Sequence, residues 1–90
     1  MLSLLSAHDV QLHLATAIRA KRGALKLSRD ALAERSTVPS PTIKKFETTG
    51  QISLRQFILL WQVVDQLERI DSLTQPDQPN PKSIDEVLRG

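Results

Sequence analysis

The chain has 90 residues, a formal net charge of +2 and no cysteine. This length suits one small domain with a modest core and leaves little room for the walls of a catalytic cleft. The lack of cysteine excludes a disulfide framework and thiolate metal sites. No apolar run approaches the roughly 20 residues that a membrane-spanning helix needs. We therefore expect a cytoplasmic protein without a membrane partner.

Side chains that carry out catalysis do not occur in any familiar spacing. No serine or threonine stands in a nucleophile motif, and no glycine-rich phosphate loop is present. His8 and His13 are five residues apart, which places them on different sides of a helix and argues against a shared metal ion. The sequence therefore predicts a protein that is not an enzyme, with no cofactor and no metal site.

Charge is distributed unevenly along the chain. Residues 1–46 carry eight basic and three acidic side chains, a net charge of +5, whereas residues 47–90 carry four basic and seven acidic side chains, a net charge of −3. Solvated charges on helix surfaces would explain either half alone. Together, the two halves suggest that the first half meets a polyanion and that the second half has another role.

The first helix is expected over residues 7 to 21 or 22. Ser6 is placed to cap this helix, and Asp9 stands three residues later, as in a capping box. Gly23 is expected to end the helix. Apolar residues at helical spacing predict the side that faces the core, which consists of Val10, Leu14, Ala17 and Ile18.

Residues 27–50 predict two short helices joined by a tight turn. Ser28 is expected to cap the first helix, and residues 36–39 are expected to break it. Ser40 is expected to cap the second helix, with Pro41 tolerated in the first turn because its missing N–H would be unpaired there. The outer face of the second helix carries Ser40, Pro41, Lys44 and Lys45. This pattern is typical of a helix-turn-helix, whose second helix enters the DNA major groove.

A fourth and a fifth helix are expected after a loop around Gly50. Ser53 is placed to cap the fourth helix, over residues 54–64, and a short fifth helix near residues 67–73 follows a bend at Asp65. The core face of the fourth helix is expected to consist of Leu54, Phe57, Ile58, Trp61 and Val64.

The fourth helix is more apolar than one core face requires. A second apolar stripe continues into the fifth helix and consists of Leu59, Val63, Leu67 and Ile70. Burial on two sides within one core is one explanation, and a dimer interface is the other. We favour the dimer interface, because a domain this small has little core in which to bury two stripes.

The composition changes at Pro76, where a proline-rich tail follows the domain of residues 1–75. Within the tail, residues 76–90, the segment from Ser83 to Glu86 has the pattern of a capping box. Ile84, Val87 and Leu88 follow helical spacing, but the segment is too short for a stable isolated helix. It is expected to dock on a partner, to dock on its own domain, or to stay disordered.

The run from Leu14 to Trp61 resembles the Cro/C1-type (XRE) helix-turn-helix family. The resemblance is carried by LxxAIRAKR at 14–22, LSRDALAERSTV at 27–38, PTIKKFETTG at 41–50 and ISLRQFILLW at 52–61. It implies a compact, all-α, lambda-repressor-like domain of five helices. The order of TIKKFE followed by GQISL is also similar to HipB-type antitoxins, whose partner is a HipA-type kinase toxin.

The resemblance also implies which residues bind DNA. Phosphate contacts are expected at the start of the second helix and after the third, and base contacts at the start of the third helix. Arg29 stands where the family often has glutamine, and Thr37 where glycine is common, which implies some strain in the turn. The expected DNA-binding residues are Ser28, Arg29, Ser40, Pro41, Thr42, Lys44, Lys45 and Thr48.

A structural ion pair is a further implication of the resemblance. It places Arg22, at the end of the first helix, against Glu47, at the end of the third. A partly buried pair at these positions would lock the two helices together, whereas two ordinary surface charges would not.

The function implied by the resemblance is a sequence-specific, DNA-binding transcriptional repressor. It would bind double-stranded operator DNA as a homodimer, associated with the nucleoid. The narrower similarity implies the autoregulating antitoxin of a HipBA-like operon, with a HipA-like kinase toxin as partner. Two alternatives stay open: a phage-type Cro/C1 regulator, and a protein-binding module that neutralises a toxin and for which DNA binding is secondary.

Overall fold

The structure, a computed structural model, describes residues 4–76. In chain order these residues form α1 (Ala7–Ala24), α2 (Arg29–Ser36), α3 (Ser40–Thr49), α4 (Leu54–Val64), α5 (Leu67–Asp71) and a 3₁₀ turn, η1 (Ser72–Thr74). This part of the chain contains no strand, so the all-α class predicted from the sequence is confirmed for it. The tail segment with Ile84, Val87 and Leu88 lies outside the described residues.

Side-chain caps begin three of the helices as predicted. The Ser6 hydroxyl accepts a hydrogen bond from the Asp9 backbone N–H, and the Ser6 N–H donates to the Asp9 carboxylate, which completes the capping box of α1. The Ser28 hydroxyl accepts from the Ala31 N–H at the start of α2, and the Ser53 hydroxyl caps α4 in the same way. These caps satisfy N–H groups that a helix leaves unpaired at its start.

Two helix ends differ from the sequence prediction. Ser40 does not cap α3: Pro39 occupies the cap position, with an extended backbone, and Ser40 is the first helical residue. Proline favours this conformation because its ring fixes φ. Gly23 does not end α1, which continues to Ala24, because the left-handed turn after the helix falls on Lys26, with φ 58°.

The core lies where α1, α2, α3 and α4 meet. Its fully buried large side chains come from all four of these helices and from the residue before Pro39, and they are Ile18, Leu32, Val38, Ile43, Phe46 and Leu60. The Phe46 and Phe57 rings pack edge to face, with centroids 5.8 Å apart. An edge-to-face pair of this kind adds to the stabilisation that burial of the two rings provides.

The predicted core faces of α1 and α4 are partly wrong. Val10 is exposed, and Ala15 is buried in its place; Leu54 is 72% exposed, and Leu60 is buried. Leu54 is the first residue of α4 and lies at the rim of the core. The buried stripe of α4 therefore starts one turn later than the apolar spacing suggests.

The second apolar stripe is divided between the core and the surface. Leu59, Val63 and Ile70 are half-buried and pack against the core, whereas Leu67 is 36% exposed. All four side chains keep some exposed surface in the single chain, and Leu67 keeps the most.

A polar joint fixes the bend between α4 and α5 near Asp65, where the sequence predicted one. The Trp61 indole N–H donates to the Gln66 carbonyl oxygen at 2.8 Å. The Asp65 carboxylate pairs with Lys21 of α1 at 2.7 Å and with Arg69 of α5. Lys21 and Arg69 also lie 5.4 Å and 5.5 Å from the centroid of the Trp61 ring, within cation–π distance.

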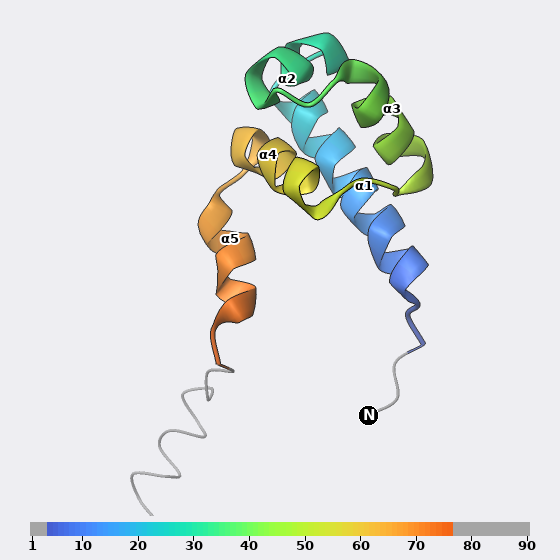
Figure 1. Ribbon diagram of the computed structural model, residues 1–90, viewed down its shortest axis with the longest axis vertical. Helices are drawn as coiled ribbons and strands as arrows, with labels where there is room; N and C mark the ends of the chain where they lie inside the picture. Colours follow the sequence, from blue (N-terminus) through green and yellow to red (C-terminus); the bar gives the residue numbers. More distant parts are fainter. Residues whose placement is uncertain (1–3, 77–90) are drawn as a thin grey trace, which may run out of the picture.

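The helices are arranged so that the starts of α2 and α3 lie together. Figure 1 shows α2 and α3 at one end of the molecule, with α4 between them and α5, and α1 running from beneath α2 and α3 towards the N-terminus. α1 contacts both α3 and α4, and α2 contacts α3 and α4. Among residues 4–76, no helix combines the length and apolar character required to cross a bilayer.

Candidate nucleic-acid interface

A basic groove of about 730 Å³ lies between the C-terminal half of α1 and the first turns of α2 and α3. We define the basic groove by its lining residues, which are Arg19, Arg22, Ser28, Arg29, Asp30, Ser40, Pro41 and Lys44. Four of these side chains are basic and one is acidic. The helices that provide them are separate in sequence, so the fold concentrates positive charge at one place.

Five residues predicted to bind DNA meet in the basic groove. Ser28 and Arg29 come from the start of α2, and Ser40, Pro41 and Lys44 from the first turns of α3. Helix N-termini carry a partial positive charge and free N–H groups. Both helix starts therefore add to the charge of the basic side chains.

Three other predicted residues do not line the basic groove. Lys45 is exposed on α3, and Thr42 is half-buried. The Thr48 hydroxyl donates to the carbonyl oxygens of Lys44 and Lys45, at 2.9 Å and 3.1 Å, near the end of the same helix. Lys45 is the one charged residue of this set, and it extends the positive surface of α3 beyond the groove.

The ion pair expected between Arg22 and Glu47 is present, and it joins Arg22, which lines the groove, to α3. Arg22 donates through Nε to Oε2 of Glu47 at 2.8 Å and through Nη2 to Oε1 at 3.0 Å, a bidentate geometry. Arg22 Nη1 also donates to the Leu27 carbonyl oxygen at 2.9 Å. The Glu47 side chain is 0% exposed and that of Arg22 is 14% exposed. Removing one partner of such a buried pair costs about 3–5 kcal/mol.

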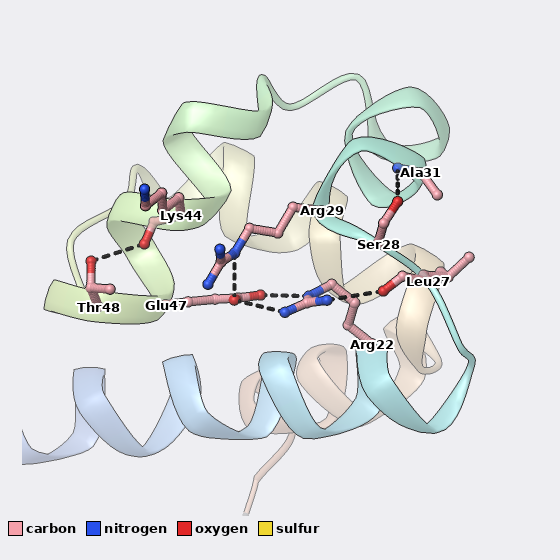
Figure 2. A network of polar contacts seen from close by, with 8 residues as sticks. All are labelled: Arg22, Leu27, Ser28, Arg29, Ala31, Lys44, Glu47 and Thr48. Atoms are coloured by element: carbon pink, nitrogen blue, oxygen red, sulfur yellow. Dashed lines mark hydrogen bonds and ion pairs between the residues drawn. The ribbon is translucent and has the colours of Figure 1, made fainter.

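Arg29 extends this pair into a network of three side chains, which was not predicted. Its Nε donates to the same Oε1 of Glu47 at 3.0 Å. Figure 2 shows Arg29 reaching from the start of α2 towards α3, above the Glu47 carboxylate and near Lys44. One buried carboxylate thus balances two guanidinium groups, and the network keeps a net charge of +1.

The hydrogen bonds of the network favour the charged forms of Glu47 and Arg22. Burial by itself would raise the pKa of Glu47, but the hydrogen bonds from Arg22 and Arg29 outweigh burial and lower that pKa. The hydrogen bond to Glu47 raises the pKa of Arg22. Glu47 therefore stays ionised at neutral pH, and Arg22 stays charged.

Arg19 was missed by the sequence prediction, although a signal for it exists. It precedes Arg22 by three residues on α1, a spacing that places two side chains on the same helix face. Asp30, in the first turn of α2, is the acidic residue that lines the groove. The contribution of α1 to the basic groove therefore depends on tertiary packing more than on any motif.

The turn between α2 and α3 sets the position of α3. Thr37 ends α2 in the left-handed region, with φ 65°, and its N–H donates to the Ala33 carbonyl oxygen. The Ser36 hydroxyl is buried and accepts from the Val38 N–H at 3.1 Å. These bonds bring α3 alongside α2 within three residues.

No family model, curated protein or solved structure matches this chain. Its function is therefore inferred from the basic groove and from the residues that line it.

Proposed function

We propose that this protein binds double-stranded DNA through the basic groove and the exposed face of α3. The observation that carries the proposal is the convergence of four basic side chains, from three helices, at the starts of α2 and α3. A helix–turn–helix with this charge distribution fits the major groove with its second helix, while the first helix contacts the backbone.

Each part of the surface has a separate role in this proposal. Arg29 and the first turn of α2 bind phosphate, because a helix N-terminus and a guanidinium both favour an anion. Lys44, in the basic groove, and Lys45, exposed beside it, reach base edges or phosphates from α3. Ser40 adds a hydroxyl at the start of α3. Phosphate contacts would fix the orientation of the protein, and base contacts would supply specificity.

The biological role that we propose is a transcriptional repressor that binds a pseudo-palindromic operator as a homodimer. The finer proposal is an autoregulating antitoxin of a HipBA-like operon, and its support is the similarity of residues 42–54 to HipB-type antitoxins. A phage-type Cro/C1 regulator is the alternative. A kinase-like reading frame next to the gene would favour the antitoxin, and phage genes would favour the alternative.

A gel-shift assay with the DNA upstream of the protein's own gene tests DNA binding. The Lys44→Ala/Lys45→Ala double variant should bind more weakly, by about 1–3 kcal/mol for each lysine that reads a base. Arg35→Ala, an exposed position of α2 that does not line the basic groove, is the control with one charge removed. Wild-type affinity in the double variant would contradict the role of α3.

A further inference from the structure

Arg29 holds an unusual position in the Glu47 network. Its side chain is 33% exposed at the wall of the basic groove, whereas the carboxylate to which it donates is completely buried. Only its Nε takes part in a hydrogen bond among the described residues. The two terminal nitrogens are therefore available to a ligand in the groove.

We propose that Glu47 is a positioning residue for DNA binding, which acts by fixing the guanidinium of Arg29 so that its terminal nitrogens face a backbone phosphate. This inference rests on the proposed DNA-binding function and adds a residue that would not touch the DNA. The Arg22–Glu47 pair holds α1 against α3. The hydrogen bond from Arg29 shares Oε1 of Glu47 with that pair and fixes the Arg29 side chain in the groove.

The physical reason is conformational entropy. A free arginine side chain loses rotamer entropy when it is immobilised, and its long stem makes this loss among the largest of any side chain. Glu47 imposes that order before DNA arrives, because its carboxylate is itself held by two bonds from Arg22. The planar guanidinium can satisfy Glu47 through Nε and still present a fork to a phosphate, which a lysine ammonium cannot do.

Electrostatic repulsion and positioning predict opposite changes in DNA affinity when Glu47 is neutralised. A carboxylate next to a phosphate-binding groove repels DNA, so its neutralisation should strengthen binding and steepen the salt dependence. If Glu47 positions Arg29, its neutralisation should weaken binding and flatten the salt dependence. The sign of the change therefore separates the two effects.

The experiment measures the affinity of the full chain for mixed-sequence duplex DNA over a series of salt concentrations. The salt dependence of the affinity reports the number of phosphate contacts, and it does not require a known operator sequence. Glu47→Gln should weaken binding roughly tenfold, the size of one charged hydrogen bond. It should also reduce the salt slope by about 1. Glu47→Asp retains the charge but withdraws the carboxylate by about 1.5 Å, and should weaken binding as well.

A double-mutant cycle separates positioning from damage to the fold. In an Arg29→Ala background the Glu47→Gln change should no longer weaken binding, because the side chain through which it acts is missing. Arg35→Ala serves as the background with a matched loss of charge, and there the effect of Glu47→Gln should persist. Melting curves identify any variant that is unfolded at the assay temperature.

A second measurement needs no DNA. The Nε–H proton of Arg29 should exchange slowly with solvent in NMR spectra of the wild-type protein and rapidly in Glu47→Asp.

Three results would overturn the inference: tighter DNA binding by Glu47→Gln, equal weakening by Glu47→Gln in the Arg29→Ala background, or unchanged proton exchange in Glu47→Asp. A wild-type protein that binds no duplex DNA would instead overturn the proposed function, while the exchange measurement would still report whether Glu47 orders Arg29.

Discussion

Thr37 has a left-handed backbone that glycine would adopt with less strain. A β-branched residue at φ 65° is an outlier, and the left-handed conformation costs an L-residue about 1–2 kcal/mol. Thr37→Gly removes this strain. Glycine also gives the unfolded chain more conformational freedom, which lowers the free energy of unfolding by about 0.5–1 kcal/mol. The variant should therefore be more stable by up to about 1 kcal/mol, as measured by urea unfolding.

Lys26→Gly is the matched control, because Lys26 also has a left-handed backbone, with φ 58°, but is not β-branched. Its gain in unfolding free energy should be smaller than that of Thr37→Gly. A loss of stability in Thr37→Gly would show that the threonine side chain supports the turn and does not strain it.

At the scale of residues, the sequence predicted those side chains whose role is local. The capping serines Ser6, Ser28 and Ser53 could be placed because a cap depends on three or four neighbouring residues. Arg29 was expected to bind phosphate alone. Its bond to Glu47 depends on the packing of α2 beside α3, and no spacing in the sequence encodes that distance.

Two glycines at helix ends have opposite requirements. Gly23 lies within α1, and a Cβ added there would have open space. Gly50 follows α3 with φ 76°, and an added Cβ would lie 3.1 Å from the backbone carbon of Gln11. Gly23→Ala should stabilise the protein by about 0.5–1 kcal/mol. Gly50→Ala should destabilise it by more than about 1 kcal/mol, as measured by thermal unfolding.

The contrast between the two variants contains its own control, since both add one methyl group at the end of a helix. Equal effects would contradict the assigned end of α1 and the close approach of the loop after α3 to α1.

Two carboxylates make the helix contacts sensitive to acid. The side-chain hydrogen bond from Lys21, with further bonds from Gln66 and Arg69, lowers the pKa of Asp65 from 3.8 to about 2. The pKa of Glu47 is also lowered. Each group binds fewer protons in the folded state, so its contribution to stability is complete above its unfolded pKa and declines as pH falls through its folded pKa.

The melting temperature of the wild-type protein should accordingly decrease between about pH 5 and pH 2. Asp65→Asn should melt at a lower temperature at neutral pH and show a smaller decrease in acid, because one of the two groups is missing. Asp71→Asn, an exposed aspartate of α5, is the control. An unchanged pH profile in Asp65→Asn would show that the ion pairs of Asp65 contribute nothing to stability.

At the scale of helices, boundaries were predicted well where a cap or a bend has a local cause, and core faces less well. The start of α4 at Leu54 and the bend at Asp65 agree with the sequence prediction. The burial of Leu60 in place of Leu54 does not. Both leucines belong to a helix that is apolar on almost every side, so periodicity alone cannot choose the buried face.

For the whole molecule, the proposed homodimer requires an apolar surface that lies away from the basic groove. Leu67 is the most exposed member of the stripe predicted to form a dimer interface, and it lies on α5, away from the basic groove. Leu67→Asp should convert a dimer to a monomer without unfolding the domain, because Leu67 is not part of the core. Sedimentation or light scattering measures the mass, and circular dichroism checks the fold.

Leu25→Asp places the same charge at an exposed leucine between α1 and α2 and should leave the mass unchanged. Leu59→Asp should instead unfold the protein, because Leu59 packs against the core. A monomeric wild-type protein, or a Leu67→Asp variant that stays dimeric, would contradict this interface.

At the scale of the molecule, the all-α class and the order of helices followed from apolar periodicity and capping residues. The basic groove could be predicted only in part, since Arg19 and Arg22 are brought to α2 and α3 by the packing of α1. Which apolar surface stays exposed depends on how α5 folds back, and a pattern of leucines does not determine that.

Trp61 is the only tryptophan of the chain, and it lies at the joint between α4 and α5. Its indole donates to Gln66 and has Lys21 and Arg69 beside its ring. The emission of an indole depends on its solvation and on nearby charge. The intrinsic fluorescence of this protein should therefore report the detachment of α5 from the domain as an optical signal, with no label added and separately from the loss of helix.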